Sequence, residues 1–230
     1  MTEIRMPYNN ECPDFYPLMT REGETKWIFS GAHDTYIVGE IKSGSFVPEQ
    51  EELPYQIGNG MSYAAQTFSG IPDRRIKIAW DRTNAPGAVF NSQMSIPVEM
   101  SLIKLDGQYR LASMPVRELG KYRVPGFQRD SAVEFFCQPD ENCGTFTVSC
   151  FGMEIRVDPT SGTYSHGNCT APLTYSGEKQ MTVIFDSLGL EVFADAGMIY
   201  TTMAALADRE KAFILTGEFR GSYTVNSLHF

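Results

Sequence analysis

A segment close to the amino terminus combines a carboxylate with a proline and aromatic residues: Asn10-Glu11-Cys12-Pro13-Asp14-Phe15-Tyr16. Proline lacks an amide donor and biases the preceding residue toward extended backbone. We therefore expect Glu11 at a strand end or in a loop, with Cys12 extended. A carboxyl group in a partly enclosed apolar site keeps its proton near neutral pH and acts as a general acid. Glu11 is a candidate for that chemistry, and the alternative is an ordinary surface glutamate.

Further segments along the chain carry distinctive patterns of aromatic, charged and small residues. In chain order they are Lys26-Trp27-Ile28-Phe29-Ser30-Gly31-Ala32 with Tyr36-Ile37-Val38-Gly39-Glu40, Tyr63-Ala64-Ala65-Gln66-Thr67-Phe68, Arg74-Arg75-Ile76-Lys77-Ile78-Ala79-Trp80, Ser95-Ile96-Pro97-Val98-Glu99-Met100, and Phe185-Asp186 through Glu191-Val192-Phe193. Together with Glu11-Cys12-Pro13-Asp14 they resemble, in the same order, motifs of glycoside hydrolase family 32, the β-fructosidases that include invertases, levanases and inulinases. The resemblance extends across nearly the whole chain.

This resemblance implies an all-β fold, in which the last blades of a five-bladed β-propeller are followed by an antiparallel β-sandwich. It implies a retaining glycosidase acting on a fructose-containing sugar (sucrose, levan or inulin type), with no cofactor. Glu11 would be the general acid/base, Trp80 the floor of the fructosyl subsite and Tyr63 a residue near it. Aromatic faces pack on the C–H faces of sugars. Cys12 is a further candidate for the substrate site, where its thiol beside the acid would donate weakly to a neighbouring carboxylate. The alternative for Cys12, Tyr63 and Trp80 is simple burial in the core.

Two motifs of that family do not occur in the printed sequence. The family's nucleophile is an Asp in W-M-N-D-P-N-G and its transition-state stabiliser is an Asp in R-D-P, and neither motif is found here. Both normally precede the Glu-Cys-Pro-Asp motif, and retaining glycosidases need two carboxyl groups. We therefore expect the C-terminal portion of such an enzyme, inactive by itself. Among the other carboxylates near these motifs, Asp14 is expected to accept backbone amides or to pair with an Arg. The rest are expected to be solvated: Asp34, Glu40, Asp73 and Asp81.

Composition argues against several classes of partner. The formal net charge of −9 argues against nucleic acid, because phosphate binding needs clustered Lys and Arg. No apolar run approaches the roughly 18 residues of a membrane helix. Five Cys and three His without a C-x-x-C pair predict no metal site. A disulfide among the four later Cys stays open. The start carries no signal-peptide pattern, but we expect the chain to be truncated at its front, so its location, cytoplasmic or secreted, stays open.

Short runs rich in Val, Ile, Phe, Tyr and Thr, separated by Gly- and Pro-containing turns, predict strands throughout. They lie at 26–30, 35–41, 62–68, 75–80, 97–104, 132–137, 144–150, 152–157, 181–185, 189–194 and 212–219. Asp106-Gly107 predicts a hairpin turn, and Pro115 to Leu119 a short helical turn. Only Met203 to Lys211 has a helix-forming composition. We expect propeller blades over 1–119 and a β-sandwich over 120–230.

Two blades of a five-bladed ring leave apolar faces open to water. At roughly 25 cal/mol per Å², each uncovered face forfeits several kcal/mol, and large exposed apolar patches are rare on monomers. The chain is therefore expected to self-associate, or to bind the missing N-terminal half, through those faces. Two other hypotheses remain for the whole chain. One is a non-catalytic carbohydrate-binding or scaffold protein derived from such an enzyme, and the other is a β-rich structural module.

Overall fold

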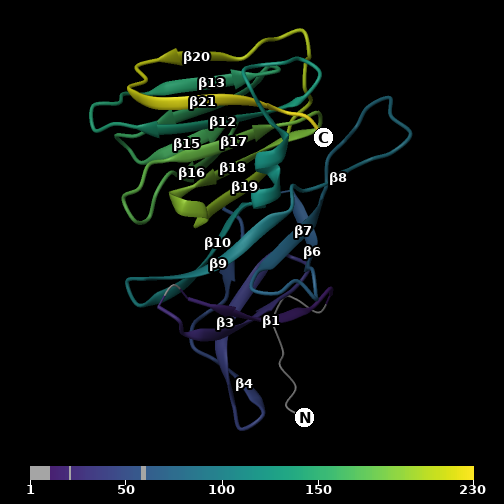
Figure 1. The fold of residues 1–230 in the computed structure, drawn as a ribbon, viewed down its shortest axis with the longest axis vertical. Coiled ribbons are helices and arrows are strands. Elements are labelled where there is room, and N and C mark those ends of the chain that lie inside the picture. The colour runs from purple at the N-terminus through teal and green to yellow at the C-terminus, as the bar shows by residue number, and fades with distance from the viewer. Residues whose placement is uncertain (1–10, 21, 58–60) are drawn as a thin grey trace.

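The computed structural model describes residues 11–20, 22–57 and 61–230, and its regular elements are almost entirely β-strands (Figure 1). Asn10, the first residue of the segment that contains Glu11, lies outside these described residues. Four antiparallel sheets account for the strands. The first two occupy the lower half of Figure 1, and the last two occupy the upper half. The predicted all-β class is confirmed.

The first blade is a meander of four antiparallel strands, with the short strand β5 (Leu53–Pro54) paired to the third of them. Its side chains alternate between two faces, as the period of two in a strand requires. Tyr16 pairs with Ile28 on the buried face, and Phe15 pairs with Phe29 on the opposite face. The four strands are β1 (Asp14–Met19), β2 (Thr25–Ser30), β3 (Thr35–Lys42) and β4 (Ser45–Pro48).

The second blade has the strand order β10-β9-β7-β6, with the short strand β8 paired to β7. Asp106 and Gly107 join β9 to β10 with φ angles of 49° and 81°. Positive φ at both positions is what a two-residue type I′ turn needs, so the predicted hairpin is confirmed. The strands are β6 (Ser62–Thr67), β7 (Arg75–Asp81), β8 (Gln93–Met94), β9 (Val98–Leu105) and β10 (Gln108–Pro115).

A 3₁₀ turn, η1 (Arg117–Tyr122), leads from the second blade into the sandwich, where a short helical turn was predicted. One sheet has the order β11-β21-β12-β17-β18-β19 and the other β16-β15-β14-β13-β20. The strands are β11 (Arg123–Pro125), β12 (Ala132–Pro139), β13 (Phe146–Cys150), β14 (Met153–Asp158), β15 (Thr163–His166), β16 (Cys169–Pro172), β17 (Met181–Phe185), β18 (Gly189–Ala194), β19 (Ile199–Ala204), β20 (Ile214–Gly217) and β21 (Gly221–Leu228). A second 3₁₀ turn, η2 (Asp195–Gly197), connects β18 to β19.

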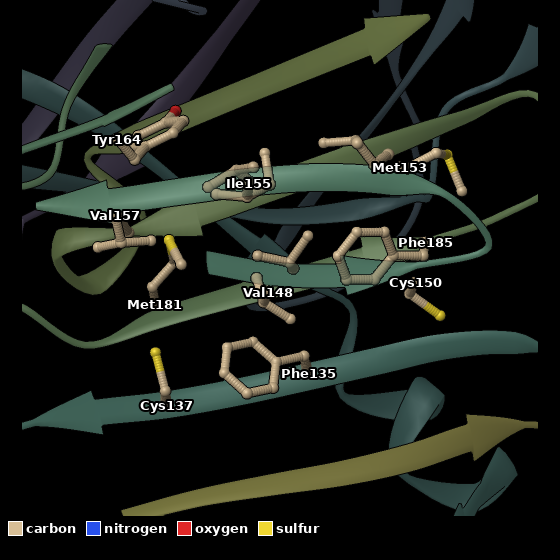
Figure 2. Close-up of a cluster of buried hydrophobic side chains, with 14 of the residues drawn as sticks. Phe135, Cys137, Val148, Cys150, Met153, Ile155, Val157, Tyr164, Met181 and Phe185 are labelled. Carbon is tan, nitrogen blue, oxygen red and sulfur yellow. The ribbon is translucent and has the colours of Figure 1, made fainter. Parts of the chain in front are cut away.

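The main hydrophobic core lies between the two sheets of the sandwich (Figure 2). Phe135 and Phe185 come from the six-stranded sheet, and Val148 and Ile155 come from the five-stranded sheet. All four side chains are fully buried. Alternate positions of each strand supply this core, as in other sheet-on-sheet packings.

A second buried cluster joins the blades to the outer face of the six-stranded sheet. Phe193 and Tyr200 of the sandwich belong to it together with Leu111 of β10. The rings of Phe193 and Tyr200 stack with their centroids 4.8 Å apart. Close by, Gly197 has a φ of 89°, and a Cβ there would lie 2.6 Å from the carbonyl oxygen of Ser113. Only glycine allows η2 to approach β10 this closely.

The helix predicted from Met203 to Lys211 is wrong. Met203 belongs to β19, which pairs with β18 along its whole length, and the residues that follow form no helix. Thr201 and Thr202 in this strand are fully buried, and β-branched residues fit a packed sheet better than a short helix. No helix among the described residues is long and apolar enough to cross a membrane.

The shared cluster predicts that the blades and the sandwich stabilise each other. Phe193 is 1% exposed, so Phe193→Ala should lower the free energy of unfolding by about 3–5 kcal/mol in urea denaturation followed by circular dichroism. Phe230→Ala is the matched control, because Phe230 is 81% exposed and should change stability by less than about 0.5 kcal/mol. Equal losses of stability in Phe193→Ala and Phe230→Ala would contradict a stabilising hydrophobic cluster between the blades and the sandwich.

Candidate active site

Glu11 lies in the bend that precedes β1, with an exposed side chain, so the predicted strand-end position is confirmed. Its carbonyl oxygen accepts the N–H of Ala32 at 3.0 Å, and the carbonyl of Cys12 accepts Nε2 of Gln66 at 2.8 Å. The extended backbone predicted for Cys12 is wrong, because its φ is 47°. The two hydrogen bonds hold the bend in this shape and outweigh the local bias of Pro13. The free thiol of Cys12 is exposed, so it is not a simply buried cysteine.

Tyr63 brings the predicted site residues together. Its hydroxyl donates to Oε2 of Glu11 at 2.6 Å. This hydrogen bond, with burial second, raises the pKa of Tyr63 above its ordinary value. Trp80 pairs with Tyr63 across β6 and β7, and their rings meet edge to face at 6.3 Å. Trp80 is 45% exposed, so its ring is available to a ligand.

A β-bulge in β6 sets the direction of Tyr63. The register shifts between the Tyr63–Trp80 pair and the next pair, and Ala64 inside the shift has a φ of 50°. Bulges of this kind bend a strand and re-aim its side chains, often beside functional sites. The N–H of Ala64 donates to the carbonyl of Ala32 at 2.9 Å. The bulge therefore ties β6 to the same loop that holds Glu11.

Asp14 fixes the start of β1 against β6. Its Oδ2 accepts both the backbone N–H and the hydroxyl of Thr67, each at 2.7 Å. The predicted acceptance of a backbone amide by Asp14 is confirmed. The Asp14 carboxylate, three residues after Glu11, therefore has a structural role in joining β1 to β6.

A buried charged cluster, Asp34, Lys77, Asp81 and Glu191, lies next to these aromatic residues. Nζ of Lys77 is 3.1 Å from Oδ1 of Asp34, and its positive charge also acts on the carboxyl groups of Asp81 and Glu191. Burial first, and then the Glu191 carboxylate, raise the pKa of Asp81 to about 8. Burial likewise raises the pKa of Glu191 to about 7, against hydrogen bonds from Ile96 and Tyr200. The unpaired carboxyl groups thus hold protons near neutral pH, as buried acids do.

The solvated roles expected for Asp34 and Asp81 are wrong, because these side chains are 5% and 0% exposed. Lys77 and Glu191 of the same cluster were not predicted at all as site residues. A signal was present in β7, where Lys77 and Asp81 are four residues apart and so share one face of the strand. That face is buried, which the sequence alone does not reveal.

A cavity of about 210 Å³ opens beside Tyr63, and we call it the Tyr63 cavity. The rings of His33 and Tyr63 meet edge to face at 5.4 Å, and the Arg82 guanidinium lies 4.8 Å from the Tyr63 ring centre. Its lining residues are His33, Asp34, Pro54, Gln56, Ser62, Tyr63 and Arg82. Among the described residues, no group of three or more His, Cys, Asp or Glu is arranged to hold a metal ion.

Comparisons with known proteins find relatives in sequence. Residues 2–115 match the model of the "Glycosyl hydrolases family 32 N-terminal domain". A levanase of Bacillus sp. (strain L7) is 30% identical over 137 residues, and a fructan beta-fructosidase of Streptococcus mutans serotype c is 26% identical over 142 residues. Each match takes in 50% of this chain, but only 15% of the levanase and 10% of the fructan beta-fructosidase.

Solved structures show the same fold. The exo-inulinase of Aspergillus awamori superposes with a TM-score of 0.77 at 17% identity, over 97% of this chain and 59% of that chain. A fructofuranosidase of Schwanniomyces occidentalis, solved with fructose, gives 0.71 at 17% identity over 97% of this chain and 61% of that chain. The fold is thus that of the propeller-and-sandwich glycosidases. The resemblance seen in the motifs is confirmed: the chain is related to glycoside hydrolase family 32, the β-fructosidases.

The buried charged cluster predicts a pH-dependent stability. The pKa of Asp81 rises from 3.8 to about 8 on folding, so the folded state holds the proton more tightly. The contribution of the protonated Asp81 carboxyl to the free energy of unfolding is therefore complete below about pH 4, and it is lost as the pH rises to about 8. Asp81→Asn replaces this titrating group by a neutral amide. The free energy of unfolding of the variant should therefore rise relative to that of the wild type between about pH 4 and pH 8, by at most about 1.4 kcal/mol per pH unit. Urea denaturation at a series of pH values measures the difference.

Asp106→Asn is the control, because Asp106 lies exposed in the β9–β10 turn. Its difference from the wild type should stay nearly constant over the same pH range. A constant difference for Asp81→Asn as well would contradict a protonated buried carboxyl at this position.

Proposed function

We propose that the chain is part of a retaining glycoside hydrolase that cleaves β-fructosides of the sucrose, levan or inulin type, with Glu11 as its general acid/base. The observation that carries this proposal is the 2.6 Å hydrogen bond from Tyr63 to the Glu11 carboxylate beside the exposed ring of Trp80. The sequence relatives, a levanase and a fructan beta-fructosidase, support the same substrate class.

In this role Glu11 first protonates the leaving oxygen and then activates the water that releases the sugar. The Tyr63 hydroxyl bonds to one carboxylate oxygen only, which orients the group and leaves Oε1 for the substrate. Trp80 supplies an apolar face for the C–H side of the sugar ring. Cys12 lies beside the acid with its thiol exposed, and we place it at the edge of the substrate site.

Structural neighbours support a fructose-containing ligand. The Schwanniomyces occidentalis enzyme has been solved with fructose and with fructosylnystose, and the Bombyx mori enzyme BmSUC1 with sucrose. At sequence identities of 15–17% these structures establish only a shared fold, and a fructose-containing ligand for this chain is part of our proposal.

Hydrolysis also needs a nucleophile, and we propose that it comes from a polypeptide segment other than the one printed. The sequence contains no W-M-N-D-P-N-G motif. Two carboxylates of this part of the chain already have partners, since Asp14 accepts hydrogen bonds from Thr67 and Asp34 pairs with Lys77. A general acid alone gives only about 10²–10⁴-fold acceleration. The same observations favour one alternative function, a carbohydrate-binding protein without turnover.

We further propose two domains, 1–119 and 120–230. In support, the strands from 14 to 115 pair only with one another, and those from 123 to 228 do the same. The first domain has an aromatic face, which we define as Phe15, Trp27, Phe29 and Phe46 on one side of the first blade. Phe15 stacks on Trp27 at 4.7 Å and meets Phe46 edge to face at 5.5 Å. Exposed Met19 and Ile41 extend it.

An apolar sheet face of this kind is normally covered. We propose that another β-sheet packs on the aromatic face, either from a second copy of this chain or from a longer form of the protein. Burying such rings yields about 1.5–3 kcal/mol for each large side chain.

Sugar titration tests the catalytic proposal. The purified chain should bind fructose or a fructo-oligosaccharide in isothermal titration calorimetry and release almost no fructose. Trp80→Ala should weaken the binding about tenfold or more, a loss of about 1.4 kcal/mol, because the stacking face is removed. Phe230→Ala is the control, since Phe230 is exposed on the sandwich and contacts Tyr122.

Rapid fructose release that persists in Glu11→Gln would contradict the role of Glu11. Release that disappears in Glu11→Gln would support that role and overturn the proposal of a nucleophile from elsewhere. Failure to bind any fructoside would leave the structural module as the better description.

Association tests the aromatic face. The wild type should self-associate in analytical ultracentrifugation and bind a hydrophobic dye. Met19→Lys with Ile41→Lys should weaken association about tenfold or more, because ammonium groups would have to be buried. Ile214→Lys is the control, as Ile214 is 52% exposed on a sandwich strand. A monodisperse wild-type monomer that binds no dye would refute the proposal.

A further inference from the structure

The end of β7 packs against the sandwich, and we call this contact the blade–sandwich interface. Asp81, the last residue of β7, pairs with Ser62 of β6 on one side and with Gln93 of β8 on the other. A Cβ on Gly189 of β18 would lie 3.5 Å from Nε2 of Gln93, so the sandwich closely approaches this end of the strand. Asp81 is 0% exposed there.

The charges that are buried at this interface do not balance. The buried charged cluster contains three carboxyl groups and one ammonium group, and Nζ of Lys77 already pairs with Asp34 of the first blade. Glu191 of β18 supplies one of the carboxyl groups from the sandwich side. Neither carboxyl oxygen of Asp81 has a hydrogen-bond partner among the described residues. Asp81 and Glu191 therefore have opposite sides of the interface and no counter-ion of their own.

The Asp81 carboxyl group is stable in these surroundings only with its proton. Burial disfavours the charged form of an acid, and a neighbouring carboxylate disfavours it further. Burial first, and then Glu191, raise the pKa of Asp81 to about 8; Lys77 of the same strand opposes this rise, and Asp34 adds to it. Ionised Asp81 would be a buried carboxylate without a hydrogen bond, which is among the most costly groups in a protein interior.

Glu191 faces a different set of groups. It accepts the N–H of Ile96 and the hydroxyl of Tyr200, each at 2.7 Å. Burial raises the pKa of Glu191 to about 7, these two hydrogen bonds and Lys77 oppose the rise, and Asp186 adds to it. Above about pH 7, Glu191 thus places a negative charge opposite Asp81 while retaining its own hydrogen bonds.

We propose that the blade–sandwich interface is a pH-sensitive contact, which stays closed while Asp81 is protonated and opens more often once Asp81 loses that proton. Opening exposes the Asp81 carboxylate to water, which the closed interface excludes. The hydrophobic cluster around Phe193 and Tyr200 favours the closed state at every pH, because apolar burial involves no titrating group. Loss of the proton therefore raises the open fraction and does not unfold either part.

Opening of the interface would reach the candidate active site through the chain itself. Asp81 follows Trp80 directly, and its partner Ser62 precedes Tyr63, which bonds to Glu11. A change at the ends of β6 and β7 therefore moves the aromatic residues of that site. The pH-sensitive contact rests on the buried charges and does not require that the chain cleaves fructosides.

Linkage gives the direction of the effect. The pKa of Asp81 is about 8 in the closed interface and returns toward its ordinary value of 3.8 when the interface opens, so opening releases a proton between about pH 4 and pH 8. The equilibrium constant for opening should rise with pH, by at most about tenfold per pH unit. Glu191 contributes in the same direction up to about pH 7, so the step from pH 7 to pH 8 reports mainly on Asp81.

Two backbone amides that cross the interface report its opening. The N–H of Met61 donates to the hydroxyl of Thr202 at 3.0 Å, and the N–H of Thr202 donates to Oε1 of Gln56 at 3.2 Å. Hydrogen exchange of the full chain, followed by NMR and corrected for the intrinsic exchange rate, gives the protection factor of each amide. Between pH 7 and pH 8 the protection factors of both should fall about fivefold, whereas amides of β13 and β14 in the sandwich core should keep theirs.

Variants identify the group that titrates. In Asp81→Asn the protection factors of Met61 and Thr202 should be the same at pH 7 and pH 8, because no proton is released there. Asp81→Leu is a second variant without a titrating group, and it covers the case in which a buried amide impairs folding. Asp106→Asn is the matched control, since Asp106 is exposed in the β9–β10 turn, and it should keep the fivefold fall.

Glu191→Gln tests the second half of the pair. Its neutral amide no longer opposes the ionisation of Asp81, so the fall in protection should end at a lower pH than in the wild type. A parallel fall at β13 and β14 would indicate a loss of global stability and would overturn the proposal. Unchanged protection in the wild type, or a fivefold fall that persists in both Asp81 variants, would overturn it as well.

Discussion

The buried ion pair between Asp34 and Lys77 is the interaction on which the rest of the site depends. It links the loop after β2 in the first blade to β7 in the second, where both side chains are almost fully buried. Burying one charge without the other costs several kcal/mol, so the blades have little freedom to slide. Ala32, two residues before Asp34, holds both the Glu11 bend and the β6 bulge. The position of Glu11 is therefore set by a charge pair that it never touches.

The same region fixes the sandwich to the blades. Glu191 of β18 accepts the N–H of Ile96 at 2.7 Å and the hydroxyl of Tyr200 at 2.7 Å. Gln56 bonds to Thr202 from the blade side. These polar contacts are directional, whereas the hydrophobic cluster around Phe193 and Tyr200 is not. Apolar burial thus supplies the stability of the interface, and the hydrogen bonds determine its orientation.

Sequence patterns predicted most of the fold and part of the site. The alternating runs at 26–30, 62–68 and 75–80 became strands β2, β6 and β7 with bounds shifted by a residue. Strand β21 (Gly221–Leu228) was missed, because it is mostly exposed and its place between β11 and β12 comes from pairing over about a hundred residues. The motifs assigned Glu11, Tyr63 and Trp80 to one site, and in the structure Tyr63 contacts both of the others. Burial of Asp81 and Lys77 could not be predicted, since it depends on which face of β7 the sandwich covers.

Buried polar groups behave differently in the two parts of this molecule. The sandwich core is apolar and satisfied by its own sheets, while the blade interface gathers carboxyl groups, an ammonium and unpartnered hydroxyls beside Tyr63. Such groups reduce stability unless something bonds to them. Two of these groups, at Ser62 and Asp81, adjoin in sequence the residues Tyr63 and Trp80 of the candidate site, so the cost in stability falls on the same strands that position Glu11.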